Sequence, residues 1–348
     1  MCSMCRSATR MQLLSMFSAE RVLVVLSVVP DAVVDGGWGV DALVGSQTRA
    51  HDDLDLVAPE DVCDRIVGDL GTLGFEMCVD ERPTRVVVAR GDERIDLHLV
   101  APAEFGKAQT LPGGTRFTYV IGDSHGTIAG QRVPCLSAPM QVLTHCGYEP
   151  DDDDRADMAL VAQASGESLP PPYAELDEVV LRPATLRDVA ALVVVRLRSW
   201  RAAYTGLMPQ GLIDAIDLGA SWVNWCSTLR VPPTPSLRVT VAGNIGTVHG
   251  FSVVSACRDD DSSGDVGEVR LLYVDPTVWN KRVGAALLAD AVDTMHGLGF
   301  RELRLWTLRE NARARSFYER FGWTADGAEQ TVEQPQGSYV EVRYRLVG

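Results

Sequence analysis

Apolar residues are arranged in two different ways along the chain. Apolar content, amphipathic spacing and capping residues predict helices at residues 18–29, 187–204, 283–296 and 311–321. Alternating or short apolar runs that end at turn residues predict strands at residues 33–34, 53–57, 94–98, 179–184, 237–242, 250–254, 269–274 and 302–308. Strands interspersed with helices in this way indicate an α/β (α+β) fold.

The composition of the sequence changes near residue 165. At 348 residues the chain exceeds what one hydrophobic core usually organises. Residues 165–178 read SGESLPPPYAELDE, and three consecutive prolines cannot continue a helix or occupy a central strand. We therefore expect a first domain at 16–165, a fairly stiff proline-rich linker at 166–177 and a second domain at 178–348.

Composition and charge narrow the classes of partner. With 46% hydrophobic and 23% charged residues the chain resembles soluble globular proteins, and its apolar run at 22–29 is far shorter than the roughly 20 residues that cross a bilayer. We expect a cytoplasmic protein without membrane contact, as a monomer or an oligomer. The net charge of −15 argues against nucleic acid and favours small cationic molecules, although it also simply favours solubility. Cys2 and Cys5 have metal-like spacing but no second pair of ligands.

Acidic residues and glycines in the first half suggest nucleotide chemistry. Asp53 and Asp55 stand two apart in an expected strand, so both carboxylates project from one face. Such a pair favours a hard divalent cation, and Mg²⁺ is the natural one beside nucleotide phosphates. Asp96, in a second expected strand, can supply a third carboxylate, to the metal or as the base for a hydroxyl nucleophile. Gly36 and Gly37 follow a short strand and let the backbone approach a ligand closely.

The segment 36–56, GGWGVDALVGSQTRAHDDLDL, resembles the aminoglycoside and lincosamide nucleotidyltransferases of the DNA polymerase beta-like superfamily. The segment 133–160 is also similar to the end of that domain, so the resemblance covers roughly 16–165. It implies a polymerase beta-like nucleotidyltransferase fold that transfers a nucleotidyl group from ATP. In that family's pattern Asp53, Asp55 and Asp96 hold Mg²⁺, Asp96 is the third catalytic carboxylate, and Gly36 and Gly37 contact the triphosphate.

Three features of this half bear on the substrate and on its alternatives. Arg49 is expected either to bind the nucleotide by neutralising the leaving pyrophosphate or to form a salt bridge that orders the acidic loop. The four aspartates at 151–154 are expected to cap a helix rather than to bind substrate. Family members often carry a proline soon after the strand of the third aspartate, whereas LVA follows here at 99–101.

The second half contains a strand, a turn and a helix start that suit a diphosphate. The strand at 269–274 ends at Asp275 and Pro276, and the next helix begins near Val283. Unpaired N–H groups and the dipole of a helix start favour anionic phosphates. Gly284 and Ala285 are small enough to let a pyrophosphate approach.

The blocks GEVRLLYVDPTVWNKRVGAALLADAVDTMHGLGF (267–300) and NARARSFYERFGW (311–323) resemble the GNAT acetyltransferases, over roughly 178–346. The resemblance implies a GNAT fold, in which a splayed mixed sheet is flanked by helices and binds acetyl-CoA. It also implies CoA-binding roles for Leu272, Tyr273, Val274, Lys281, Arg282, Val283, Gly284, Ala285 and Asn311. In the same pattern Tyr318 protonates the departing thiolate.

Two positions depart from that pattern or leave its chemistry open. Asn280 and Arg282 stand where the family usually has glycines, and their Cβ atoms narrow the permitted dihedral angles. Glu268 is expected as the general base that deprotonates the substrate amine, with an ordinary strand-edge glutamate as the alternative.

Taken together, the two halves predict a bifunctional transferase for small cationic substrates, aminoglycoside-like or other amines. One alternative is an active acetyltransferase whose first half is a non-catalytic docking or regulatory module. The other is a pair of nucleotide and CoA sensors.

Overall fold

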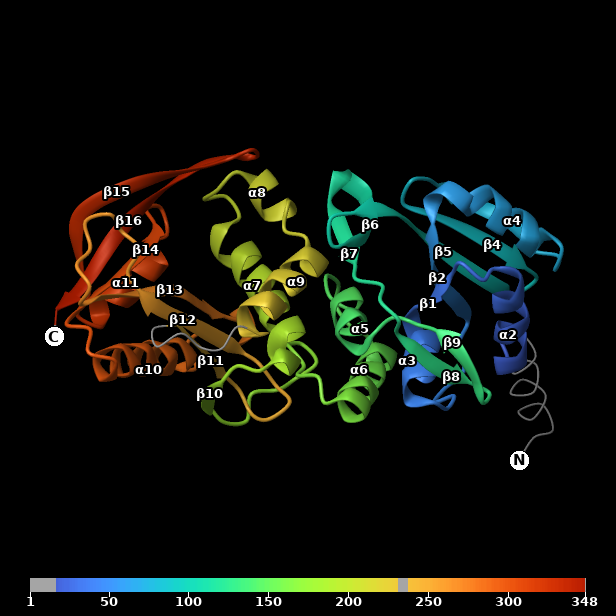
Figure 1. The fold of residues 1–348 in the computed structure, drawn as a ribbon, viewed down its shortest axis with the longest axis horizontal. Coiled ribbons are helices and arrows are strands. Elements are labelled where there is room, and N and C mark those ends of the chain that lie inside the picture. The colour runs from blue at the N-terminus through green and yellow to red at the C-terminus, as the bar shows by residue number, and fades with distance from the viewer. Residues whose placement is uncertain (1–16, 231–236, 348) are drawn as a thin grey trace, which may run out of the picture. The chain divides into compact units, whose positions relative to one another are not determined.

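The computed structural model describes residues 17–230 and 237–347, so Cys2 and Cys5 lie outside the described residues. The chain divides into two compact units, Met1–Glu167 and Ser168–Gly348 (Figure 1). Each unit is an α/β body with a mixed sheet of its own. Within the described residues, no helix combines the length and the apolar character that a membrane crossing requires.

The first unit contains five helices with at least seven residues and nine strands among its described residues. The helices are α2 (Ala19–Val28), α3 (Gly36–Val44), α4 (Cys63–Gly71), α5 (Ala138–Thr144) and α6 (Asp152–Ser165). The strands are β1 (Val33–Val34), β2 (Asp53–Pro59), β3 (Glu76–Glu81), β4 (Arg85–Arg90), β5 (Glu93–Ala103), β6 (Gly106–Thr110), β7 (Arg116–Tyr119), β8 (His125–Ile128) and β9 (Gln131–Pro134).

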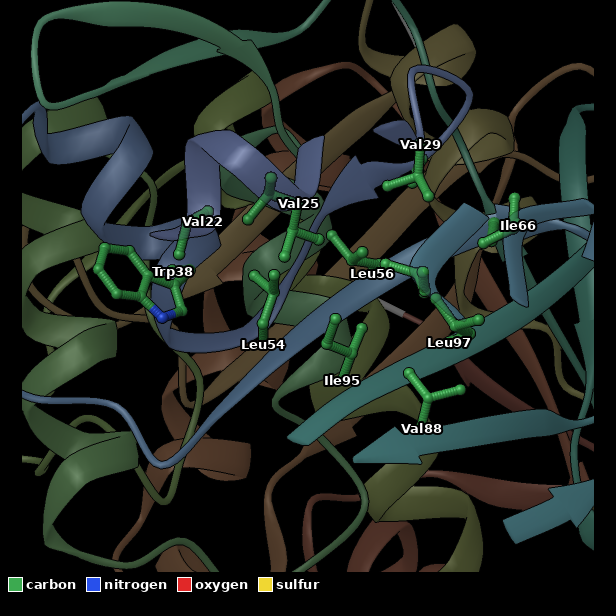
Figure 2. Close-up of a cluster of buried hydrophobic side chains, with 14 of the residues drawn as sticks. Val22, Val25, Val29, Trp38, Leu54, Leu56, Ile66, Val88, Ile95 and Leu97 are labelled. Atoms are coloured by element: carbon green, nitrogen blue, oxygen red, sulfur yellow. The ribbon is translucent and has the colours of Figure 1, made fainter. Parts of the chain in front are cut away.

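The sheet of the first unit has the order β1-β2-β5-β4-β3, and β6 and β7 extend it from the end of β5. Strands β2 and β5 are parallel, and their neighbours pair antiparallel. Because side chains alternate along a strand, Leu54 and Leu56 of β2 face the core while Asp53 and Asp55 face the other way. Figure 2 shows Leu54 and Leu56 gathered with Ile95, Leu97 and the valines of α2.

The second unit has five α-helices and seven strands among its described residues, besides short 3₁₀ turns. The helices are α7 (Val189–Tyr204), α8 (Gln210–Asp214), α9 (Leu218–Arg230), α10 (Val283–Gly297) and α11 (Ala312–Arg320). The strands are β10 (Leu181–Pro183), β11 (Arg238–Ala242), β12 (Gly250–Ala256), β13 (Val266–Val274), β14 (Glu302–Leu308), β15 (Thr324–Gln334) and β16 (Gly337–Val347).

The seven strands of the second unit form one sheet in the order β10-β11-β12-β13-β14-β16-β15. In Figure 1, α7 and α10 lie on opposite sides of strands β11 to β13. Only β13 and β14 are parallel, and they pair at three positions, the last being Glu268 with Arg304. Beyond that pair the two strands diverge, so the sheet opens between Val269–Val274 and Leu305–Leu308.

The predicted elements around the two sites are present, with two differences in detail. Gly36 and Gly37 open helix α3, whose N-cap is Asp35, rather than forming a turn of their own. Residues of the proline-rich segment pack on the second unit: the Ser168 hydroxyl donates to Asp188 at 2.6 Å and Leu169 is buried. The aspartate run caps α6 as expected, because Asp151 and Asp154 form a reciprocal capping box.

Candidate active sites

The first unit brings two carboxylates together on adjacent parallel strands. Asp55 of β2 and Asp96 of β5 are direct neighbours in the strand register. Their carboxylates and the ring of His98, two residues further along β5, offer ligand atoms that all lie within 4.8 Å of one another. Asp53 lies one pleat earlier on the same face and is exposed. The three predicted carboxylates therefore share one face of the sheet. Asp55 and Asp96 form the centre of this carboxylate cluster.

The charged groups in this cluster shift one another's pKa values. Burial by itself lowers the pKa of His98, but its 3.4 Å contact with Asp55 and the charges of Asp35 and Asp96 raise that pKa to about 9. Partial desolvation, followed by the charges of Asp55 and Asp96, raises the pKa of Asp53. Burial likewise raises the pKa of Asp35. A concentration of negative charge like this one is stabilised by a bound cation.

The surroundings of Asp96 fit a metal. Its Oδ2 accepts a hydrogen bond from Arg85 at 2.9 Å, whereas its Oδ1 is buried and has no hydrogen-bond partner among the described residues. A buried oxygen without a donor is costly unless a ligand satisfies it. Carboxylate oxygens are the donors that Mg²⁺ prefers, and His98 supplies a nitrogen that suits this ion less well.

The two glycines are required by side chains that come from the neighbouring loop and strand. Gly36 has a φ of +58°, and a Cβ at this position would overlap the Asp55 carboxylate. A Cβ at Gly37 would overlap the ring of His51. The N–H of Gly36 donates to the Asp35 side chain at 2.7 Å. Both residues thus lie beside the carboxylate cluster, and their contact with a triphosphate stays a prediction.

Arg49 forms a salt bridge, as in the second of the two roles expected from the sequence. Its guanidinium pairs with Asp157 at 2.9 Å and with Asp153 at 3.3 Å, both on α6. The neighbouring His51 is held by Asp41 at 2.5 Å, and Asp41 also accepts hydrogen bonds from Thr48. Arg49 therefore orders the acidic region through α6, and its contact with a nucleotide stays a prediction.

The gap in the second sheet contains a cavity of about 1230 Å³. The cavity, hereafter the main cavity, is lined by both diverging strands and by the helix starts that follow them. Most of the predicted CoA-binding residues line it, together with Tyr318: these are Leu272, Tyr273, Val274, Arg282, Gly284, Ala285 and Asn311. Val283 instead belongs to the buried core, and Lys281 is exposed beside the cavity without lining it. The wedge between the strands is open, as a pantetheine arm would require.

The loop before α10 adopts a conformation that normally calls for glycine. Asn280 and Arg282 both have a φ of +65°, in the left-handed region. Asn tolerates this region better than most residues because its short side chain can form local hydrogen bonds, whereas Arg has no such compensation. The backbone has therefore kept the shape expected of the glycine pattern, at the cost of strain at Arg282.

Replacing Arg282 with glycine should relieve that strain. We expect the free energy of unfolding to rise by about 0.5 to 1 kcal/mol, because the steric penalty of a Cβ in the left-handed region outweighs the added flexibility of the unfolded chain. Denaturant unfolding of the full chain measures this change. Arg282→Ala is the matched control, since it removes the charge but keeps the Cβ, and an equal gain in both variants would contradict the explanation.

Tyr318 and Glu268 occupy different places relative to the main cavity. Tyr318 of α11 lines the cavity, and burial raises the pKa of its hydroxyl well above the ordinary value. The hydroxyl thus stays protonated and able to donate. Glu268 does not line the main cavity; it is buried, 3.4 Å from Arg258. It lines a smaller polar cavity of about 400 Å³.

A second glutamate, Glu341 of β16, lines both cavities and was not found from the sequence. Burial raises its pKa, and the negative charge of Glu268 raises it further, against a hydrogen bond from Gln330 at 2.8 Å. Nothing in the local sequence distinguishes Glu341 from other polar residues of an edge hairpin. Its place depends on the pairing of β16 with β14, which sets Glu341 opposite Leu308.

Two family models match the chain, one in each unit. Residues 21–161 match the family described as aminoglycoside-2''-adenylyltransferase. Residues 215–323 match the acetyltransferase (GNAT) family.

Individual relatives divide in the same way. A lincosamide resistance protein of Staphylococcus haemolyticus is 29% identical over 128 residues, which are 36% of this chain and 80% of the relative. Spermidine N(1)-acetyltransferase of Thermoplasma acidophilum is 24% identical over 167 residues, which are 45% of this chain and 96% of the relative.

Solved structures similar to each half are also known. The lincomycin-bound lincosamide antibiotic adenylyltransferase LnuA is 24% identical with a TM-score of 0.37, covering 41% of this chain and 94% of its own. The PaiA N-acetyltransferase of Thermoplasma acidophilum in complex with coenzyme A is 19% identical with a TM-score of 0.39, covering 49% and 99%. The first unit is therefore similar to the aminoglycoside and lincosamide nucleotidyltransferases, and the second unit is similar to the GNAT acetyltransferases.

Proposed function

We propose that the chain is a bifunctional transferase for small cationic substrates, with nucleotidyl transfer from ATP in the first unit and acetyl transfer from acetyl-CoA in the second. Asp55 beside Asp96 on parallel strands carries the first activity, and the open gap between β13 and β14 carries the second. The net charge of −15 favours cationic substrates. The names of the relatives, lincosamide resistance protein and spermidine N(1)-acetyltransferase, fit such molecules.

In the first unit, Asp53, Asp55 and Asp96 would hold Mg²⁺. When bound, the ion offsets the charge of the triphosphate and of the leaving pyrophosphate. Asp96 accepts the proton of the attacking hydroxyl, and Arg85 keeps its carboxylate oriented toward the cluster. Gly36 leaves the space that Asp55 needs, and the start of α3 directs backbone N–H groups toward the phosphates.

In the second unit, the substrate amine attacks the carbonyl carbon of the thioester. The C–N bond forms as the C–S bond breaks, and Tyr318 donates its proton to the departing thiolate. The ammonium proton leaves to a carboxylate. We assign that step to Glu268, which lines the smaller polar cavity. Glu341 lines both cavities and so connects Glu268 to the main cavity.

Comparing the two glutamates by pH dependence tests this assignment. The pKa of Glu341 is raised, so its carboxylate form, which accepts protons, is lost as pH falls through that raised value. We expect Glu341→Gln and Glu268→Gln each to lower kcat/KM for acetyl transfer by about 10-fold or more near neutral pH. Each variant should also shift or remove the acidic limb of the pH profile. A profile that neither variant changes would show that the proton leaves by another route.

The first alternative is that the nucleotidyltransferase-like unit only docks substrate. Release of pyrophosphate from Mg²⁺-ATP with a panel of amines, compared between the wild type and Asp53→Asn, tests it. Our proposal expects a rate in the wild type that Asp53→Asn loses. Equal rates in the two proteins would favour the docking module, and calorimetric titration with Mg²⁺-ATP would then show whether nucleotide binding remains.

A further inference from the structure

The main cavity extends past the residues that suit CoA. One end lies at the start of α10, where Gly284 and Arg282 suit phosphates. The other end is lined by α7, by the segment around α8 and by the β15–β16 hairpin, with Trp200, Tyr204 and Tyr339 as its aromatic walls. If CoA enters beside α10, as the proposed acetyltransferase function requires, the acceptor must occupy this second end. We call it the acceptor end.

A guanidinium without an acidic partner faces the acceptor end. The Cζ atom of Arg196 on α7 lies 4.9 Å from the ring centroid of Trp200. Its Nε is buried and has no hydrogen-bond partner, and no ion pair of the described residues includes Arg196. Arg270 also lines the main cavity, where burial and the charge of Arg258 lower its pKa against the charge of Glu268. Arg196 is therefore a positioned cation that lines the cavity and has no acidic partner among the described residues.

A carboxylate with no cationic partner faces the same space. Glu341 accepts a hydrogen bond from Gln330, and no ion pair within residues 17–230 and 237–347 includes it. Burial raises the pKa of Tyr339 most, the charge of Glu341 raises it further, and the charge of Arg196 lowers it. Both charged groups therefore act on Tyr339. They share one partly enclosed space without neutralising each other.

A cation and an anion that line the same cavity without forming an ion pair can bind a molecule that itself carries one anionic and one cationic group. We propose that the acceptor of the second unit is a zwitterion, an amine that also carries a carboxylate or similar oxyanion. Its ammonium lies at Glu341 and its anionic group at Arg196. The inference rests on the proposed acetyltransferase activity, and for the second unit it replaces the cationic class of acceptor with a zwitterionic one. A planar guanidinium can bind a carboxylate through two parallel hydrogen bonds, and an adjacent carboxylate suits the ammonium that must lose its proton.

The test measures CoA release by the full chain with L-amino acids and their α-carboxamides, which keep the amine but lack the anion. Polyamines and aminoglycosides complete the panel. For the best amino acid, we expect kcat/KM to exceed that of its amide by about 10-fold or more. Arg196→Gln should lower the value for the amino acid by about 10- to 100-fold, mainly through KM, and leave the amide within about 3-fold. Arg196→Lys should restore part of the loss.

Arg201→Gln is the matched control, because Arg201 is on the same helix, exposed and outside the cavity. It should leave both substrates unchanged, and thermal unfolding of every variant checks that the second unit is folded. The proposal is overturned if amides react as well as amino acids, or if Arg196→Gln slows both equally. It is also overturned if only polyamines or aminoglycosides react, an outcome that keeps the acetyltransferase function.

Failure of the function itself gives a different result. If no amine in the panel is acetylated, the proposed acetyltransferase activity is wrong. Calorimetric titration of the CoA-saturated protein with the amino acids then tests the zwitterion site directly. Binding that Arg196→Gln weakens would support the zwitterion site, and the absence of heat for every amino acid would overturn it.

Discussion

Asp96→Asn should reduce nucleotidyl transfer by about 1000-fold or more and leave acetyl transfer unchanged. Asparagine has nearly the shape of aspartate, so β5 and its pairing with β2 are preserved. The substitution removes a negative charge from the cluster and replaces a proton acceptor with an amide. It also leaves Arg85 without its carboxylate at 2.9 Å. Pyrophosphate release with Mg²⁺-ATP and an accepted substrate measures the loss.

Asp52→Asn is the control for this prediction, because Asp52 is an exposed aspartate adjacent to Asp53 and outside the metal-ligand cluster. It removes the same charge, next to β2 and outside the cluster, and should keep the rate within about 3-fold. An Asp96→Asn protein that retains more than a tenth of the wild-type rate would exclude Asp96 as the catalytic carboxylate.

Tyr318→Phe should lower acetyl transfer by about 100-fold, the usual contribution of a positioned general acid. The ring packs against Tyr344, Trp323 and Phe317, and phenylalanine preserves that packing. Only the hydroxyl that faces the cavity is lost. Because burial holds its pKa well above the ordinary value, the wild-type rate should not fall on the alkaline side until far above neutral pH. Thiol release from acetyl-CoA with an accepted amine measures both effects.

Tyr344→Phe separates catalysis from packing. The Tyr344 hydroxyl donates to Glu319 at 2.7 Å and accepts from Arg315 at 3.1 Å, within the same aromatic cluster. Its loss should lower Tm and leave kcat nearly unchanged, the reverse of the Tyr318→Phe result. Equal effects of the two variants on kcat would mean that Tyr318 acts through packing.

The carboxylate cluster could be located from the sequence because strand periodicity is a local property. The run DLDL places Asp53 and Asp55 on one face and Leu54 and Leu56 on the other, whatever the strand pairs with. Asp96 was proposed as a third carboxylate from its own expected strand, but its position beside Asp55 depends on the parallel pairing of β2 with β5, which strand periodicity does not reveal.

For the other residues of the first site, the sequence missed either the residue or its partner, because the contacts are tertiary. His98 follows Asp96 by two residues, so strand periodicity could have found it, but its perturbed pKa depends on Asp35 and Asp55. Arg49 gave no sign of its partner, since Asp157 is 108 residues away. Gly36 was identified for a phosphate, whereas its immediate neighbour is the Asp55 carboxylate.

The second unit shows the same division. The strand, loop and helix around 267–300 were predictable, and Asn280 and Arg282 adopt the left-handed conformation that the missing glycines would have adopted. The sequence could not predict that Glu268 lies outside the main cavity, because its location depends on where β13 and β14 stop pairing. Glu341 reaches the cavity only through the edge hairpin.

Mass spectrometry of one reaction tests the central claim that a single chain carries two separate transfer activities. The mixture contains the full chain, Mg²⁺-ATP, acetyl-CoA and a panel of small amines. We predict products that have gained a nucleotidyl group and products that have gained an acetyl group, with Asp96→Asn removing only the former and Tyr318→Phe only the latter. A wild-type protein that yields no nucleotidylated product, or variants that each remove both kinds of product, would contradict the account.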